Sequence, residues 1–231
     1  MTDVFQYRVL KWMIGTNTTT IVAGGNGNGT ALNQLSLAWG GLTLDSLSNV
    51  YIPDSGNARV MKWAPGSLSG QVVAGGNGIG NGSNQLSSSI GSIAVDSKFT
   101  VFVADTDNYR IQMWPVGASS GITIIPTNTN GMYPLALELD SMGNIYVGGS
   151  NIMKYNVATK TATTIVFSYG NSSNQVGMVN GLRFAANNTN LFAVDSSNHR
   201  VQRYSVIKNC GGKSCISPFT SSFSAEILNP S

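Results

Sequence analysis

The chain repeats itself at a long and regular interval. The segment Arg8-Val-Leu-Lys-Trp12 returns as Arg59-Val-Met-Lys-Trp63 and then as Arg110-Ile-Gln-Met-Trp114, each copy 51 residues after the one before. Val22-Ala-Gly-Gly25 and Asn33-Gln-Leu35 recur at the same interval. Later copies diverge, because the aromatic residue that closes the segment comes next at Tyr155, 41 residues after Trp114, and then at Tyr204. Intervals of roughly 40 to 50 residues are typical of propeller blades and of paired-helix solenoids.

The content of each repeat distinguishes between these two architectures. One repeat holds four short runs of β-branched and aromatic residues, separated by Asp, Asn, Ser and Gly clusters, at 41–45, 49–54, 57–63 and 71–75. Such runs are strand and turn patterns. Charged residues make up only 10% of the chain, so strong helix formers are few. Four strands per repeat predict an all-β protein, a β-propeller of four-stranded blades.

Three segments share the pattern Asp-x-x-Asn-x-Arg, namely Asp54-Ser-Gly-Asn57-Ala-Arg59, Asp105-Thr-Asp-Asn108-Tyr-Arg110 and Asp195-Ser-Ser-Asn198-His-Arg200. Each follows an aromatic-rich strand run. The three copies resemble the core signature of NHL repeats, and the resemblance covers about residues 5–206. The segment 147–152 departs from the pattern, because the Asp and the Arg are both missing there. The resemblance implies a β-propeller, commonly six-bladed and usually a binding platform.

The strand runs provide about four to five blades, which suggests an incomplete six-bladed ring or a small one. We expect residues 5–24 to supply two outer strands, blades at 38–76, 89–126 and 133–167, and three inner strands from 178–206. The propeller then spans 1–206, and the tail 207–231, with its Ser and Pro residues, is expected to be a loose extension. A partial ring exposes blade edges, so we also expect self-association.

The recurrence of the signature indicates a structural role, because a catalytic group is needed once. We expect that the Asp can accept backbone hydrogen bonds in its turn, in which an Asn tolerates the left-handed conformation, and that the Arg can pair with a carboxylate on its own or a neighbouring blade. The aromatic residue of each repeat is expected to pack between blade faces. These residues are Trp12, Trp63, Trp114, Tyr155 and Tyr204.

Asp45, Asp96 and Asp140 each end the predicted innermost strand of a blade. They can cap the following turn, which we prefer, or serve as ligands at the mouth of a central channel. Cys210 and Cys215 enclose two glycines, a lysine and a serine, so a local disulfide is open to them in an oxidising compartment.

The chain lacks the residues that several classes of chemistry require. The one histidine and two cysteines cannot assemble a His-rich zinc site, so we expect no metal and no cofactor. The glycine-rich loops 24–29 and 75–80 have no P-loop lysine and no helix pattern after them. We therefore expect no enzyme activity, with a lyase or hydrolase that uses Asp45, Asp96 and Asp140 as the alternative.

The function that fits these observations is a non-catalytic binding scaffold for a protein or peptide. RNA binding is a further alternative, for which a face would be built from Arg8, Arg59, Arg110 and Arg200. The chain has only 13 Lys and Arg residues, and this low number argues against binding of nucleic acid. No apolar run is long enough to span a membrane. The N-terminal residues do not form a signal peptide, and the compartment stays open, with an extracellular location favoured over the cytoplasm.

Overall fold

A computed structural model of the chain describes residues 1–126, 132–168, 170, 172, 175–186, 188–210 and 213–218, and side chains only up to residue 205, without those of 167 and 168. The described residues form strands, turns and three-residue 3-10 helices. None of the helices in this part of the chain has the length and apolarity that crossing a membrane requires.

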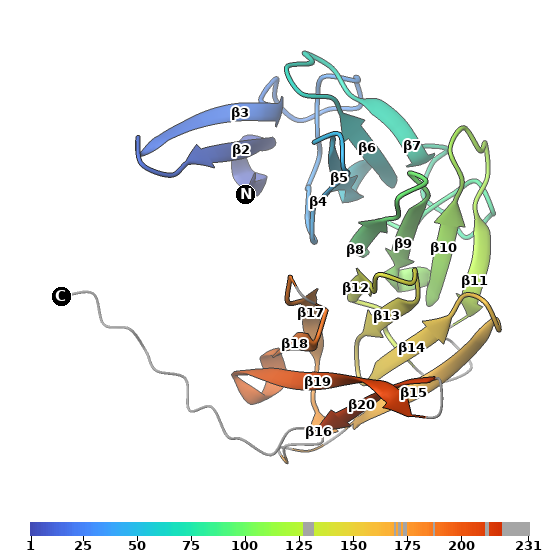
Figure 1. Cartoon of the computed structure of the whole chain (residues 1–231). Helices are drawn as coiled ribbons and strands as arrows, with labels where there is room; N and C mark the ends of the chain where they lie inside the picture. Colours follow the sequence, from blue (N-terminus) through green and yellow to red (C-terminus); the bar gives the residue numbers. More distant parts are fainter. Residues whose placement is uncertain are drawn as a thin grey trace. The chain divides into compact units, whose positions relative to one another are not determined.

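The first compact unit, Met1–Leu135, contains three antiparallel sheets (Figure 1). The first consists of β1 (Thr2–Asp3), β2 (Arg8–Met13) and β3 (Thr18–Gly24). The second consists of β4 (Thr43–Leu44), β5 (Val50–Asp54), β6 (Arg59–Trp63) and β7 (Gln71–Gly75). The third consists of β8 (Ile90–Val95), β9 (Val101–Asp105), β10 (Arg110–Trp114) and β11 (Ile122–Pro126).

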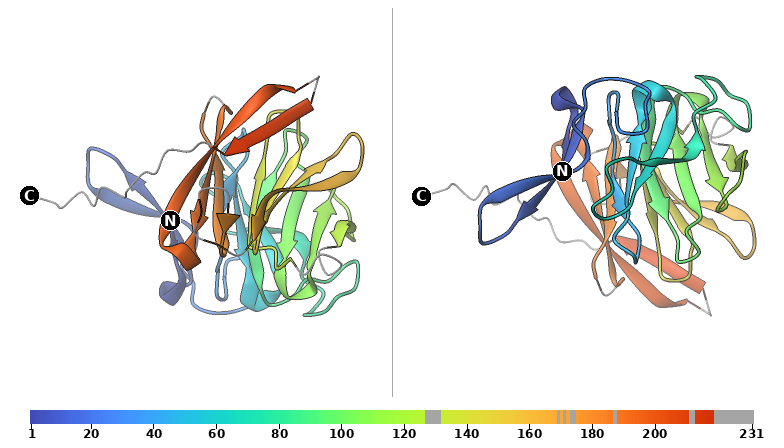
Figure 2. Two further views of the ribbon diagram at one scale, coloured as in Figure 1. Left: turned by 90° about the horizontal axis from the view of Figure 1, so that it is seen from below. Right: turned by 90° about the horizontal axis from the view of Figure 1, so that it is seen from above.

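Within this unit the sheets pack face to face through apolar side chains, as propeller blades do (Figure 2). Val9 and Ala23 of the first sheet contact Ile52, Met61 and Trp63 of the second. The opposite face of the second sheet packs in the same way on the third, and Trp114 is buried in that cluster. The period-2 alternation of strand side chains therefore gives the second sheet two apolar faces.

The second compact unit, Ala136–Ser231, contains two sheets. One consists of β12 (Ala136–Leu139), β13 (Ile145–Gly148), β14 (Ile152–Asn156), β15 (Thr161–Ser168) and β16 (Gln175–Val176), of which β16 pairs with β15 in parallel. The other consists of β17 (Val179–Phe184), β18 (Asn190–Asp195), β19 (Arg200–Cys210) and β20 (Lys213–Pro218). A single cluster that includes Tyr146, Phe184 and Tyr204 joins their faces.

The predicted all-β class and the β-propeller architecture are confirmed, with five small sheets in the described residues and four strands in most of them. Two details differ from expectation. The first sheet gains a short strand, β1, before the two that we predicted. The segment after residue 206 is not wholly a loose extension, because β19 continues to Cys210 and β20 pairs with it. Two runs separated by Gly211-Gly212 form a hairpin pattern that explains this difference.

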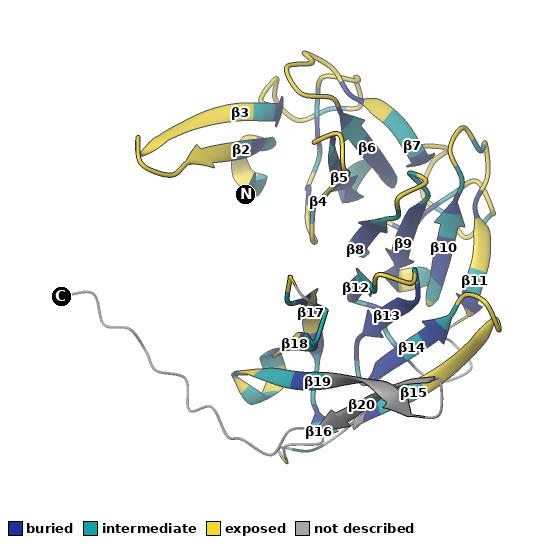
Figure 3. Cartoon of the chain, viewed as in Figure 1, coloured by how far each residue is buried: buried dark blue, intermediate teal, exposed yellow. Residues whose placement is uncertain are grey.

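The repeated aromatic residues are not all buried. Trp63 and Trp114 are fully buried between sheets of the first unit, and Tyr155 and Tyr204 are buried as well. Trp12 is 58% exposed, since in the first unit the sheet of β1 to β3 has a neighbour on one face only. Figure 3 shows the outer part of β2 and β3 as exposed. The expected packing between blades is therefore wrong for Trp12. Self-association stays a prediction.

This contrast predicts a difference in stability. Trp63→Ala should lower the free energy of unfolding by about 3–5 kcal/mol, because it leaves a cavity between two sheets. Trp12→Ala should change it by less than about 1 kcal/mol, as exposed substitutions do. Urea unfolding followed by circular dichroism measures both, and equal losses would show that Trp12 is covered in solution.

Candidate functional site

The carboxylate of Asp54 joins three segments of the first unit. Its Oδ1 accepts a hydrogen bond from the backbone N–H of Ser36 at 2.6 Å. Its Oδ2 accepts one from Asn57 Nδ2 at 2.9 Å and one from Arg59 Nε at 2.7 Å. Asp54 is 0% and Arg59 5% exposed, so the ion pair is shielded from water and its hydrogen bonds are charge-assisted. We call this Asp–Asn–Arg arrangement the clip.

The remaining donors of the clip hold the segment that links β3 to β4. Arg59 donates from Nη1 to the carbonyl of Thr30 and from Nη2 to those of Ala31 and Gln34, and Asn57 donates to Gly29. Four of the five N–H groups of the guanidinium therefore donate to acceptors from one loop and one carboxylate. The sequence had suggested that the Asp bonds its own turn, but its backbone partner lies 18 residues earlier.

The clip recurs with the same geometry. Asp105 accepts from Ser87 N, Asn108 and Arg110, and Asp195 accepts from Gly177 N, Asn198 and Arg200. Arg110 and Arg200 donate to carbonyls of the preceding linking segments, Gly82 and Gln85 for one, Ser172 and Gln175 for the other. These contacts are those of a scaffold, and the structural role of the clip residues stays a prediction to be tested below.

The left-handed residue of each clip is not the Asn. It is the residue just before the Arg, with φ of 48° at Ala58, 51° at Tyr109 and 49° at His199. It closes the 3-10 turns Ser55–Asn57, Thr106–Asn108 and Ser196–Asn198. The Asn side chain is used instead as a donor to the Asp. The single histidine therefore occupies a turn position.

A fourth clip was missed in the sequence. Asp3 and Arg8 form an ion pair at 2.9 Å around a 3-10 turn, Val4–Gln6, with Tyr7 left-handed at φ 51°. Gln6 stands where the other copies have Asn, which hid the pattern. The signal was available, because Asp3 precedes Asp54 by the same 51 residues that separate Asp54 from Asp105.

The four arginines considered for an RNA-binding face all donate to carboxylates of the protein. Arg8, Arg59, Arg110 and Arg200 pair with Asp3, Asp54, Asp105 and Asp195 respectively. Three of them also donate to backbone carbonyls. These contacts leave little of the charge for phosphates, which weakens the RNA alternative.

The turn after each innermost strand is held by the carboxylate that precedes it. Asp45 Oδ1 accepts from the backbone N–H groups of Leu47 and Asn49, and its Oδ2 accepts from Asn49 Nδ2 and Tyr51 Oη. Burial opposes ionisation of Asp45, but these hydrogen bonds outweigh it and lower its pKa. Burial and the adjacent carboxylate raise the pKa of the Tyr51 hydroxyl.

Asp96 and Asp140 repeat this turn. Asp96 accepts from the N–H groups of Lys98 and Thr100, and Asp140 accepts from those of Met142 and Asn144. Each carboxylate therefore caps its own turn, the alternative that we preferred. Among the described residues no group of three or more His, Cys, Asp or Glu side chains could hold a metal ion. The predicted disulfide falls on Cys210 and Cys215, whose side chains lie outside the described part of the structure.

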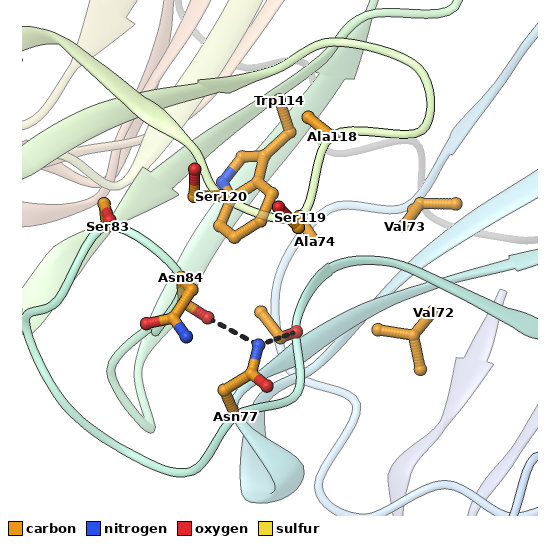
Figure 4. A pocket seen from close by; sticks show the side chains of 11 residues that line it. Val72, Val73, Ala74, Asn77, Ser83, Asn84, Trp114, Ala118, Ser119 and Ser120 are labelled. Carbon is orange, nitrogen blue, oxygen red and sulfur yellow. Dashed lines mark hydrogen bonds between the residues drawn. The ribbon is translucent and has the colours of Figure 1, made fainter.

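A groove lies between the second and third sheets of the first unit. It consists of two adjoining cavities of about 560 and 310 Å³ that share Val72, Val73, Trp114 and Ala118 as walls. Asn77, Ser83, Asn84, Ser119 and Ser120 line the larger cavity, which Figure 4 shows. Tyr51, Lys62 and Phe99 line the smaller one. We call it the Trp114 groove.

One wall of the Trp114 groove is the edge of strand β7. All five residues of β7, Gln71–Gly75, line the groove. Successive side chains on a strand point to opposite faces, so five in a row line one groove only if the strand presents its edge to it. In the described residues β7 pairs with β6 alone, so its other edge is available for pairing.

The opposite wall holds a buried donor without an acceptor. Trp114 is 2% exposed, and its Nε1 has no hydrogen-bond partner among the described residues. The ring is fixed by close packing on Gly121, where a Cβ would come within 2.6 Å of Nε1. A buried N–H without a partner costs about 1–3 kcal/mol, so the placement of this ring carries a cost in stability.

A larger cavity of about 720 Å³ between the first and second sheets is lined mostly by apolar residues, among them Trp12, Ile21 and Leu44. None of the unpartnered buried polar atoms in the described residues belongs to its walls. Its polar lining residues are Lys11, Thr20, Ser48 and Ser67, and we take the Trp114 groove as the candidate site because the free edge of β7 lines it.

Comparison with known proteins places the fold but no family. No protein-family model matches the chain, and no curated protein matches its sequence. Among solved structures, a chain from the crystal structure of a nidogen/laminin complex superposes with a TM-score of 0.64 at 18% identity, covering 86% of this chain and 70% of that one. This similarity shows the β-propeller fold.

The clip predicts strong coupling between its two charged residues. Asp105→Ala and Arg110→Ala should each lower the free energy of unfolding by roughly 3 kcal/mol, because each leaves a buried charged group without its partner. The double variant should cost clearly less than the sum of the two, which a double-mutant cycle in urea measures. Additive losses would show that the pair does not act as a unit.

Proposed function

We propose that this chain is a non-catalytic β-propeller that binds a partner protein, and that the Trp114 groove receives an extended segment of that partner. The three Asp-x-x-Asn-x-Arg clips support assigning the propeller to the NHL type. The superposed structure is a complex between two proteins, nidogen and laminin, which is consistent with a protein partner.

The observation that carries the proposal is the free edge of β7 in the groove. An extended peptide can add to such an edge through main-chain hydrogen bonds, while alternate side chains enter the flanking cavities. Val72 and Val73 offer apolar contact on either side of the strand, and the serines of the 115–120 turn offer polar contact.

The ring of Trp114 offers the same ligand a rigid apolar wall, because it lines both cavities and is fixed by packing on Gly121. Asn77 is held in place by hydrogen bonds from Nδ2 to the carbonyls of Gly75 and Asn84 (Figure 4), which supports the wall at the end of β7. The groove is therefore preorganised, which reduces the entropic cost of binding.

A bulky side chain at the shared wall tests the proposal. Ala118 lines both cavities in the exposed turn after β10, so Ala118→Tyr should fill the groove without disturbing the core. Ala158→Tyr is the matched control, because Ala158 occupies the exposed turn after β14 and lines none of the three cavities described above.

The probe is a phage library of linear random heptapeptides selected on the unmodified protein. Selected peptides should bind the Ala158→Tyr variant as well as the unmodified protein, and the Ala118→Tyr variant at least about tenfold more weakly, a change of about 1.4 kcal/mol. Calorimetry measures the affinities, and thermal unfolding confirms that both variants are folded. The proposal would be overturned if the selected peptides bound the Ala118→Tyr variant as tightly as the unmodified protein, or if no peptide were selected.

A further inference from the structure

The smaller cavity of the Trp114 groove contains a lysine whose charge is not neutralised by a carboxylate. Lys62 Nζ lies 5.9 Å from the ring centroid of Tyr51 and 5.9 Å from that of Phe99. None of the ion pairs formed by the described residues includes Lys62. Two aromatic faces favour the charged ammonium in this half-buried position, so the site holds a positive charge that is ready for an anion.

The fourth sheet has a lysine at the position equivalent to Lys62, and a carboxylate neutralises it. Lys154 Nζ lies 5.3 Å from the ring centroid of Tyr146, the counterpart of Tyr51, and 3.7 Å from the carboxylate of Asp140. In the second sheet the counterpart carboxylate, Asp45, accepts a hydrogen bond from Tyr51 Oη at 3.1 Å and makes no ion pair with Lys62. In the described residues Lys62 therefore makes no ion pair with the counterpart of the carboxylate that pairs with Lys154.

The second ring over Lys62 sits on a strained backbone. Phe99 has a left-handed φ of 61°, at a turn position where the second and fourth sheets use Ser48 and Gly143. A bulky residue there is a conformational outlier. Its ring lines the groove beside Lys62, and strain of this kind is concentrated at functional sites.

From these three observations we propose that the partner segment carries an acidic side chain, whose carboxylate pairs with Lys62 between the rings of Tyr51 and Phe99. This inference rests on the proposed function, since it specifies the chemistry of a peptide bound in the same groove. The charges are complementary, and the carboxylate of the ligand would pair with Lys62 as the carboxylate of Asp140 pairs with Lys154.

The peptide library separates this inference from the proposal on which it rests. Peptides selected on the unmodified protein should share one position rich in Asp or Glu. A synthetic peptide in which that residue is changed to Gln or Asn should bind about tenfold more weakly. The same peptide change should have no effect on the Lys62→Gln variant, because the partner charge is gone. Selection on Lys62→Glu should enrich Lys or Arg at that position.

The Lys154→Gln variant is the control, since it removes the equivalent lysine outside the groove, and it should bind the acidic peptide normally. Peptides that require an open groove, as judged by Ala118→Tyr, but show no acidic position and no dependence on Lys62 would overturn this inference and leave the proposed function standing. Failure to select any groove-dependent peptide would overturn both. The comparison of the acidic and neutral peptides on unmodified protein needs no variant, so it holds even if Lys62→Glu fails to fold.

Discussion

The fold depends on a buried carboxylate that connects a hairpin to the segment that leads into its own sheet. Asp54, Asp105 and Asp195 each accept a backbone N–H from that segment and an Nε–H from the arginine that starts the next strand. The arginine in turn bonds carbonyls of the segment. An irregular and largely exposed linker is therefore held to its sheet through several of its own backbone groups without being part of that sheet.

Most of the architecture could be predicted from the period and from the strand patterns within it. The repeated runs place β5, β6, β9 and β10 correctly, because β-branched alternation between turn residues is a local signal. The clip of Asp3 and Arg8 was not predicted because Gln6 stands where the other copies have Asn. The exposure of Trp12 was not predicted because burial depends on which sheet faces have neighbours, and the sequence of a single repeat does not contain that information.

The candidate site was not predictable in the same way. Its walls come from β7, from the 115–120 turn and from the 77–84 loop, and only the packing of two sheets brings them together. Trp114 carried the strongest repeat signal, yet the sequence indicated only its burial and not the indole N–H that lacks a partner. Lys62 resembles Lys154 in sequence, and their difference lies in the position of one carboxylate.

The clips also bear on how such a chain can change in evolution. In the three Asp-x-x-Asn-x-Arg clips the hydrogen bonds to the linking segment reach back 18 to 29 residues, so each clip closes on itself within one repeat. Duplication or loss of a whole repeat would then add or remove complete sets of donors and acceptors and would leave no ionised group unmatched. The shortened fourth repeat lacks both the Asp and the Arg, so the loss of this ion pair also left no ionised group unmatched. The number of residues between blades can therefore change, provided that the Asp and the Arg of each clip are kept together or lost together.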